Sequence, residues 1–433
     1  MEAMAIKKRA IIIGIDGVPH ELIVRFAADG TMPNMGRILP AGTMRRMESS
    51  IPDVSCVAWS TVITGKNPGE HGIYGFMNLS PGTYRFAFPT FNDLKAAPLW
   101  EESPGRRSVI VNIPGTYPAR QLNGVMISGF VAIDIERAVY PKSLVPKLME
   151  LGYRIDVDAA KGHADMAAFL RDCEETLEAR VRSYRYLWEG EAWDLFFLVF
   201  TSTDRLSHFL FEAFEKKDHR YHDVFRSHFR RIDEIVGEIY GRLRDDDLFM
   251  VLSDHGFGVI EKEVNINCFL KERGFLNIAN PSPDSFEGVG EGSTAFALDP
   301  ARIYVHMAGR YPRGCVKQDD RARVVGDLEA VLRELTVDGK PVVRRICRSE
   351  KIFSGPCADR APDLVILPHR GFDLKARLVA NQLTSKGAFT GAHTQDNAFL
   401  FVRSGQLRES AIPPHPWVGD VRHLIEKGIA SKE

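Results

Sequence analysis

The chain has 433 residues, of which 44% are hydrophobic and 26% are charged. This length accommodates one large α/β domain with insertions or two ordinary domains, and the composition is typical of a globular protein with a sizeable core. The 56 Lys and Arg residues nearly balance the 57 Asp and Glu residues, so the formal net charge is −1. This balance argues against a nucleic-acid polymer or a membrane surface as the partner.

The N-terminal sequence has basic residues before an apolar run, as a signal peptide does. The run Ala10–Ile15 is nevertheless too short for the apolar region of such a peptide and includes Gly14. No stretch of the sequence approaches the roughly 18–20 apolar residues of a membrane span. The six cysteines are scattered without a C-x-x-C pair, which is typical of reduced thiols. We therefore expect a cytoplasmic protein, with a periplasmic one as the alternative.

Three short apolar runs are each followed closely by an acidic residue. AIIIGI leads to Asp16, LFFLVF leads to Asp204, and LFMVL leads to Asp254. Continuous apolar runs of this length suit strands that are buried on both faces of a parallel sheet. Amphipathic helical stretches, such as Ala164–Trp188 and Val224–Leu243, lie between the runs. The alternation predicts an α/β fold with a doubly wound, mostly parallel sheet and helices on both of its faces.

Any one of the three acids could simply cap a helix, but the three together favour a metal site. Ligands of open parallel sheets bind beyond the carboxyl ends of the strands, where these acids lie. Three carboxylates gathered there would repel one another unless a cation neutralised them.

Histidines accompany these acids at spacings that suit metal ligands. Asp204 and His208 are four residues apart and share one face of a predicted helix, although such a pair alone is more often a salt bridge or a cap. Asp254 and His255 precede glycines that allow a sharp exit from the strand, although a polar turn is the alternative. His393 lies in a stretch of small residues, and its prediction as a metal ligand rests on the presence of the other predicted ligands. A mixed set of Asp and His ligands favours Zn²⁺, with Mn²⁺ or Fe as alternatives.

The segment 51–76, IPDVSCVAWSTVITGKNPGEHGIYGF, contains a candidate nucleophile. Val57–Thr64 is predicted to form a short helix that Gly65 ends. Ser55 would then lie at or near the helix N-terminus, where N–H groups and the helix dipole favour a phosphate. A simple N-cap serine is the alternative. Coordination to a metal would make the hydroxyl a competent nucleophile.

The pattern is looser beyond Gly256. It includes a Gly/Pro/Ser-rich stretch at 280–293, strand-like segments at 302–307 and 364–367, and an amphipathic helix around 321–335. We predict a single catalytic domain over residues 1–433 with a smaller inserted subdomain at about 259–385. Met77–Ala97 is expected to form a surface excursion that lines a substrate pocket.

In their order along the chain, these motifs resemble those of the alkaline phosphatase superfamily. The likeness is to the type I phosphodiesterase/nucleotide pyrophosphatase branch and to the phosphohydrolases and phosphomutases grouped beside it. It runs from IIIGIDG to GAHTQDN and includes Ser-x-x-x-Trp, HGI, D-x-x-x-H, SDHGFG and G-x-H. The resemblance implies an alkaline phosphatase-like fold and a two-metal phosphoryl-transfer hydrolase.

The resemblance also implies a role for each matching residue. One ion would be bound by Asp16, Asp254 and His255 and would also contact the Ser55 oxygen. The second ion would be bound by three further residues, namely Asp204, His208 and His393. Ser55 would attack phosphorus to give a phosphoserine, and water would then hydrolyse this intermediate.

The sequence departs from the family pattern at two places, and one of them is the nucleophile, which is usually threonine in that branch and is serine here. The nucleotide pyrophosphatases have an asparagine shortly after HGI, and the same spacing here gives Phe76, so Asn78 is the candidate replacement as a substrate contact. Arg205, beside a predicted ligand, is a second candidate contact to the substrate phosphate. Cys56 raises the question of a sulfatase, but the proline and arginine of the sulfatase motif C-x-P-S-R are missing.

Three functions therefore stay open after the sequence is read. The first is a phosphoric-ester hydrolase, with a phosphodiesterase favoured over a phosphomonoesterase, that acts on a small-molecule phosphate ester. The second is a phosphomutase or phosphotransferase, which shares every ligand, so the motifs do not separate the two. The third is a metal-binding protein without turnover, against which the presence of Ser55 argues.

Overall fold

The computed structural model describes residues 8–279, 285–404 and 407–430. The described residues form two compact units. Unit 1 lies within Met1–Lys66, Thr90–Phe257 and His393–Glu433, and unit 2 lies within Asn67–Pro89 and Gly258–Ala392. A single catalytic domain with an inserted subdomain stays a prediction, because compactness alone does not show which parts fold together.

Unit 1 is built on an eight-stranded sheet. Its strands are β1 (Ala10–Ile15), β2 (Thr43–Met47), β5 (Ser108–Val111), β6 (Gly124–Ile127), β7 (Val139–Tyr140), β8 (Leu195–Phe200), β9 (Leu248–Leu252) and β20 (Ala398–Arg403). They are arranged in the order β2-β20-β9-β1-β8-β5-β6-β7. The five strands from β9 to β6 pair in parallel, whereas β2, β20 and β7 each pair in antiparallel at the sides. The predicted mostly parallel sheet is confirmed.

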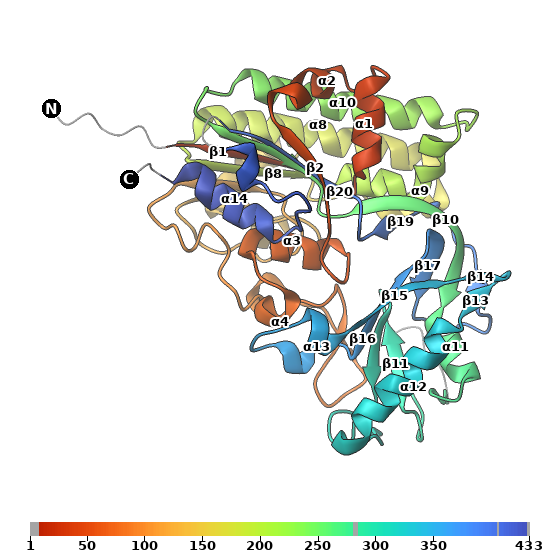
Figure 1. Cartoon of the computed structure of the whole chain (residues 1–433). Helices are drawn as coiled ribbons and strands as arrows, with labels where there is room; N and C mark the ends of the chain where they lie inside the picture. The colour runs from red at the N-terminus through yellow and green to blue at the C-terminus, as the bar shows by residue number, and fades with distance from the viewer. Residues whose placement is uncertain (1–7, 280–284, 405–406, 431–433) are drawn as a thin grey trace. The chain divides into compact units, whose positions relative to one another are not determined.

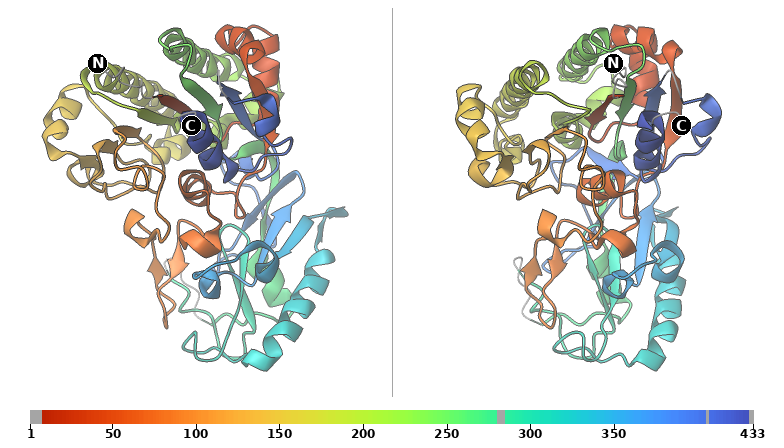
Figure 2. Two further views of the ribbon diagram at one scale, coloured as in Figure 1. Left: turned by 60° about the vertical axis from the view of Figure 1, so that its left-hand side comes forward. Right: turned by 90° about the vertical axis from the view of Figure 1, so that its left-hand side faces the viewer.

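Helices cover both faces of this sheet. Figures 1 and 2 show α1, α2, α8, α9 and α10 on one face and α3 and α14 on the other. The helices of unit 1 are α1 (His20–Ala28), α2 (Pro33–Ile38), α3 (Ser55–Thr64), α5 (Ile135–Ala138), α6 (Val145–Glu150), α7 (Ala159–Ala164), α8 (Met166–Gly190), α9 (Ser202–Glu215), α10 (His222–Gly241) and α14 (Asp420–Ile429). The two long amphipathic stretches predicted from the sequence correspond to α8 and α10.

The three apolar runs form the adjacent central strands β9, β1 and β8, and every residue in them is buried. Strands covered on both faces need apolar side chains at every position, which explains the continuous runs. Gly14 of β1 leaves space for an aromatic ring, because an added Cβ would lie 2.4 Å from the Trp59 indole of α3. The helix that carries Ser55 therefore packs closely on the strand that precedes Asp16.

Unit 2 contains smaller sheets and four described helices. Its helices are α4 (Pro68–His71), α11 (Ile266–Glu272), α12 (Arg321–Arg333) and α13 (Ser349–Ile352). Its strands are β3 (Asn78–Leu79), β4 (Phe86–Ala87), β11 (Ala295–Leu298), β12 (Arg302–Val305), β13 (Thr336–Val337), β14 (Lys340–Pro341), β15 (Val343–Arg348), β16 (Leu364–Pro368), β17 (Gly371–Lys375) and β18 (Thr384–Ser385). Two more strands, β10 (Gly256–Asn265) and β19 (Gly391–Thr394), run across the unit boundary in the chain. Three-residue 3-10 helices occupy Leu39–Ala41, Phe91–Asp93, Lys142–Leu144, Gln318–Asp320, Ala358–Arg360 and Glu409–Ala411.

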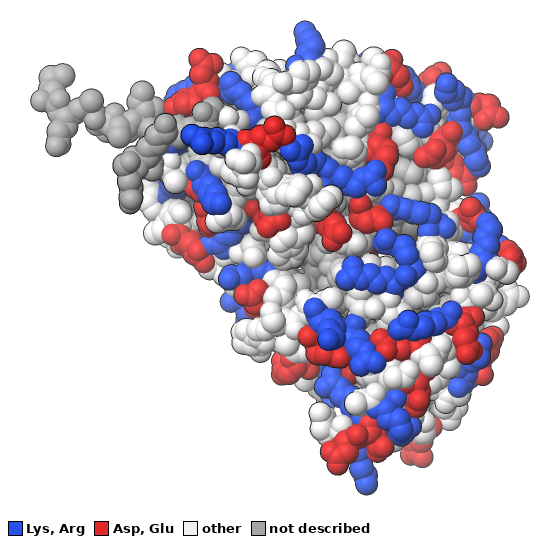
Figure 3. Space-filling view, viewed as in Figure 1, with Lys and Arg blue, Asp and Glu red and all other residues white. Residues whose placement is uncertain are grey.

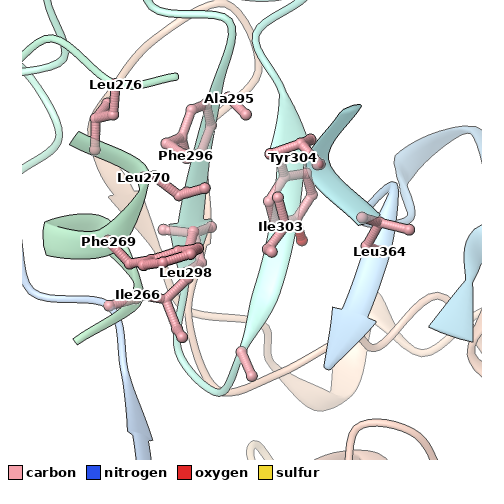
Figure 4. Close-up of a cluster of buried hydrophobic side chains, with 14 of the residues drawn as sticks. Ile266, Phe269, Leu270, Leu276, Ala295, Phe296, Leu298, Ile303, Tyr304 and Leu364 are labelled. Carbon is pink, nitrogen blue, oxygen red and sulfur yellow. The ribbon is translucent and has the colours of Figure 1, made fainter. Parts of the chain in front are cut away.

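Unit 2 has a hydrophobic core of its own. Figure 4 shows Phe269 and Leu270 of α11 beside Phe296 of β11 and Ile303 of β12. Tyr84 is fully buried in the same core, and its hydroxyl forms a 2.7 Å hydrogen bond with the His306 Nε2 atom. The expected surface excursion is therefore wrong for Tyr84, because its ring packs among aromatic partners that lie far away in the sequence.

The surface carries charges of both signs. On the face drawn in Figure 3, Lys and Arg side chains are interspersed with Asp and Glu side chains. Among the described residues, no helix is long and apolar enough to cross a membrane.

Candidate active site

The three predicted acids lie at one edge of the central sheet. Asp16 follows the last residue of β1, Asp254 follows β9, and Asp204 lies in the first turn of α9, just after β8. Parallel register places the carboxyl ends of these three strands side by side. Each acid is at most 4% exposed. The structure therefore brings the three carboxylates together away from bulk water, as the sequence pattern predicted.

Asp16, Asp254 and His255 form the first candidate metal group. One potential ligand atom from each residue lies within 4.8 Å of the other two. The His255 Nε2 atom is 3.6 Å from Asp16 Oδ1 and 3.5 Å from Asp254 Oδ2. The His255 Nδ1 atom lies 3.1 Å from the Gly256 carbonyl, which can only accept, so Nδ1 carries the proton and Nε2 presents a lone pair.

Asp204, His255 and His393 form the second candidate group, so His255 lies within reach of both. The His393 Nε2 atom is 3.2 Å from Asp204 Oδ1, and His393 Nδ1 donates to the Asp53 carbonyl at 3.0 Å. His208 lies beside this group, with its Nε2 atom 3.5 Å from Asp204 Oδ1 and 3.0 Å from His393 Nε2. All six predicted metal ligands are therefore gathered in one place.

The oxygens of this cluster fit cations. Within the described part of the chain, Asp204 Oδ1 and Asp254 Oδ2 are buried and have no hydrogen-bond partner. Burial, followed by the charges of Asp254 and Asp204, raises the pKa of Asp16 well above its usual value. Burial and the charge of Asp204 raise the pKa of Asp254 to about 7. Bound cations would both satisfy the oxygens and offset this repulsion.

The protonation state of the buried His255 suits metal binding. Burial, followed by the charge of His393, lowers the pKa of His255 to about 3, so its imidazole is neutral at physiological pH. Burial also acts to lower the pKa of His393, but the neighbouring Asp204 raises it on balance. The six residues thus supply carboxylate oxygens and imidazole nitrogens, a donor set that suits Zn²⁺ and similar ions.

Ser55 is the first residue of α3, two residues before the predicted start of the helix. Gly65 ends the helix in the left-handed conformation, with a φ of 65°, as predicted. The Ser55 Oγ atom donates to Asp16 Oδ1 at 3.4 Å and lies 3.2 Å from His255 Nε2. The serine is 6% exposed. Its hydroxyl therefore lies directly beside the first candidate metal group, at the positive end of a helix.

The sequence analysis assigned no role to two residues that position these acids. The Trp59 Nε1 atom donates to Asp16 Oδ2 at 2.9 Å, and the backbone N–H of Gly17 donates to Asp254 Oδ1 at 3.2 Å. Gly17 has a φ of 67°, and an added Cβ would lie 2.6 Å from the Phe257 ring. The four-residue spacing places Trp59 on the same face of the helix as Ser55, but it does not specify the hydrogen bond to Asp16, which depends on how α3 packs on β1.

The two predicted substrate contacts are placed differently. Arg205 is in unit 1, where its guanidinium donates to Asp156 and to Asp204. Asn78 is in unit 2, where its Oδ1 atom accepts a 2.7 Å hydrogen bond from the buried Arg302. Contact of either residue with substrate stays a prediction.

The chain is similar in sequence to one family of known proteins. A sequence profile of the family "Type I phosphodiesterase / nucleotide pyrophosphatase" matches residues 10–395. A search of curated protein sequences returns no match.

Solved structures share the fold over nearly the whole chain. Phosphonoacetate hydrolase from Sinorhizobium meliloti 1021, in complex with phosphonoformate, matches with a TM-score of 0.64 at 18% identity, covering 98% of this chain and 96% of that one. Inactive murine ectonucleotide pyrophosphatase / phosphodiesterase 5, in complex with AMP, matches with a TM-score of 0.58 at 12% identity, covering 98% and 95%. The alkaline phosphatase PafA matches with a TM-score of 0.58 at 11% identity, covering 99% and 96%.

Proposed function

The chain belongs to the type I phosphodiesterase / nucleotide pyrophosphatase family of the alkaline phosphatase superfamily, and we propose that it is a two-metal phosphoric-ester hydrolase with Ser55 as its nucleophile. The position of the Ser55 hydroxyl carries the proposal. It lies at a helix N-terminus, 3.4 Å from Asp16 Oδ1 and 3.2 Å from His255 Nε2. A structural N-cap serine would not need to lie against a cluster of potential metal ligands.

In this proposal, six residues bind two divalent ions, with Zn²⁺ favoured over Mn²⁺ or Fe. Asp16, Asp254 and His255 form one site, which also includes the Ser55 oxygen. Asp204, His208 and His393 form the other site. When bound, the ions lower the pKa of the serine hydroxyl and stabilise the charge that develops on the phosphoryl group.

The chain's own residues account for the remaining steps. Ser55 Oγ forms a bond to phosphorus as the ester oxygen leaves, which gives a phosphoserine. Water then attacks that phosphorus, and Ser55 is released. The N-terminus of α3 favours binding of the phosphoryl group, because backbone N–H groups at a helix N-terminus donate hydrogen bonds to anions. Trp59 and Gly17 contribute by fixing Asp16 and Asp254 through the hydrogen bonds described above.

The proposed substrate is a small phosphorus ester, with diesters favoured over monoesters. Support comes from the family and from the small phosphorus compounds, phosphonoformate and AMP, in the similar structures. Phosphonoacetate is included as a further candidate because one similar protein is a phosphonoacetate hydrolase, although it is not an ester and its leaving group would be carbon in place of the ester oxygen. A phosphomutase or phosphotransferase is the alternative, since its chemistry would use the same ligands and the same serine.

The test compares metal-depleted protein, titrated with Zn²⁺ or Mn²⁺, with its Ser55→Ala variant. The substrates are bis-p-nitrophenyl phosphate, p-nitrophenyl phosphate and phosphonoacetate. We expect metal-dependent turnover that falls at least about 1,000-fold in Ser55→Ala, because this variant removes the nucleophile while the metal ligands remain. Ser55→Thr is the matched control, since it retains the hydroxyl and part of the activity.

Two results would contradict the proposal. One is a parent protein that binds no divalent ions, and the other is a Ser55→Ala variant with unchanged turnover. If the phosphoryl group passes to an added alcohol in preference to water, the transferase alternative replaces the hydrolase.

A further inference from the structure

We infer that Arg205, fixed in place by Asp156, is a positioning residue that directs the Asp204 carboxylate toward its metal ion. This inference rests on the proposed function, because it assigns a role within one of the two proposed metal sites. It also differs from the substrate contact expected for Arg205 from the sequence.

Three nitrogens of the Arg205 guanidinium already have protein acceptors. Nε and Nη2 donate to Asp156 Oδ2 at 3.0 and 2.7 Å, and Nη1 donates to Asp204 Oδ2 at 3.3 Å. The Phe130 ring lies beneath the guanidinium, 4.1 Å from Cζ. The side chain is 15% exposed. Arg205 is thus held in one orientation by contacts along its edge and on its face.

The contact with Arg205 distinguishes the two oxygens of Asp204. Oδ2 accepts from Arg205, whereas Oδ1 is buried without a hydrogen-bond partner among the described residues. Oδ1 is also the oxygen that faces the histidines, at 3.2 Å from His393 Nε2 and 3.5 Å from His208 Nε2. The guanidinium therefore leaves Oδ1 as the oxygen that is available to a metal ion.

Asp156 is itself fixed to the ends of two strands. Its Oδ1 atom accepts from Thr201 Oγ1 at 3.1 Å, and Thr201 directly follows β8. The Asn112 amide, directly after β5, donates to the Val199 carbonyl at 3.0 Å and to Thr201 Oγ1 at 3.4 Å. Asn112 is fully buried and has a φ of 64°. A continuous chain of hydrogen bonds therefore connects the sheet to Arg205 and on to Asp204.

The local charge balance favours positioning over substrate binding. Arg205 contacts two carboxylates, those of Asp156 and Asp204, so its positive charge is already compensated. An incoming phosphate would have to compete with Asp156 for the same nitrogens. Partners of metal ligands typically act by orienting the ligand, and their loss weakens metal binding about 10–100-fold.

The experiment measures metal binding directly in the full-length protein. Metal-depleted Arg205→Gln is titrated with Zn²⁺ in competition with a chelator, and Co²⁺ is used to record the visible absorption spectrum of the loaded sites. We expect about 10–100-fold weaker binding of one of the two ions and a changed Co²⁺ spectrum, while the other ion binds as in the parent. KM for the ester preferred by the parent should change by less than about threefold while kcat falls, because uniform substrate binding is retained.

Arg9 provides a matched control in the same unit. It donates through Nε and Nη2 to Asp247, lies 4.5 Å from the Trp193 ring and is also 15% exposed. It precedes β1, at the opposite end of the strands from the candidate active site. Arg9→Gln therefore removes a similar ion pair and aromatic contact and should leave both metal affinities and the Co²⁺ spectrum unchanged.

A second variant keeps the test decisive if Arg205→Gln does not fold. Asp156→Asn retains the shape of the side chain but removes the charge that holds Arg205. This variant should weaken the binding of the same ion as Arg205→Gln does. Unchanged metal affinity in both variants would overturn the inference. If KM also rose more than about tenfold while metal affinity stayed unchanged, Arg205 would be a substrate contact instead. A parent protein that binds no metal would instead refute the proposed function, and the inference with it.

Discussion

Asp254 shows how burial and a neighbouring charge act on one side chain. The residue is fully buried, and only its Oδ1 atom has a hydrogen-bond donor among the described residues, the Gly17 N–H. Burial and Asp204 raise its pKa to about 7. In protein stripped of metal, ionisation of Asp254 therefore costs stability, and a bound cation removes that cost.

We predict that Asp254→Asn stabilises the metal-free protein. The amide carries no charge and its oxygen can still accept from Gly17, so the free energy of unfolding should rise by about 1–4 kcal/mol at pH 8. The folded pKa of about 7 exceeds the unfolded value of about 3.9, so the parent loses stability as the pH rises between these values. The advantage of the variant should therefore be small at pH 4 and largest above pH 7.

Urea unfolding in the presence of a chelator measures this difference, and repeating it with Zn²⁺ provides the control. With Zn²⁺ the parent should be more stable to urea than the variant, because the parent gains binding free energy that the variant lacks. A variant less stable than the parent in chelator at pH 8 would show that Asp254 is not under electrostatic strain.

At the scale of elements, α8 is joined to the segment before it by one buried carboxylate. Asp172 of α8 is 5% exposed and accepts from Arg154, from Lys161 and from the backbone of Asp158. Burial alone would raise the pKa of Asp172, but the hydrogen bonds from Lys161 and Asp158, together with the charges of Lys161 and Arg154, lower it on balance. The ionised carboxylate thus stabilises the packing of α7 against α8.

We predict that Asp172→Asn lowers the free energy of unfolding by about 1–3 kcal/mol at pH 7. Because the folded pKa lies below the unfolded one, the contribution is present above about pH 4 and is lost as the pH falls through the folded pKa. Unfolding curves of parent and variant should therefore converge in acid. Glu175→Gln is the control, since this exposed carboxylate shares the partner Arg154 and should contribute less than about 1 kcal/mol. Equal losses in the two variants would contradict the argument.

The sequence predicted those elements whose pattern is local. β1, β8 and β9 are continuous apolar runs, and such runs read directly as strands buried on both faces. Tyr84 was misplaced because its burial depends on His306 and Tyr311, more than 200 residues away, and no local period encodes that contact.

The candidate site was predictable to the same extent. Asp204 and His208 stand at helical spacing, and Asp16 and Asp254 follow recognisable strands. Three features needed the folded chain: His255 within reach of both metal groups, Trp59 donating to Asp16, and Asp156 fixing Arg205. They depend on strand order and helix packing, which spacing along the chain does not specify.

At the scale of the whole molecule, all six predicted metal ligands belong to unit 1. Unit 2 has its own hydrophobic core, formed by α11, α12 and the sheet β11-β12-β16-β15. A ligand stabilises those parts of a protein whose local opening would disrupt its site. Metal binding should therefore stabilise unit 1 against local opening more than it stabilises unit 2.

We predict that Zn²⁺ slows amide hydrogen exchange in peptides from β1, β9, α3 and α9, and changes it little in peptides from α11 and α12. Exchange measured by mass spectrometry on metal-free and Zn²⁺-loaded protein tests this, because each peptide reports its own segment. With ions at 100 times Kd, the gain in opening free energy should approach about 2.7 kcal/mol per site for segments that must unfold to release the ion. Asp204→Asn is the control, since it should reduce the effect in α9 more than in β9. Equal protection of α11 and α12 would show instead that the two units unfold as one, because stabilisation confined to unit 1 cannot slow local opening elsewhere.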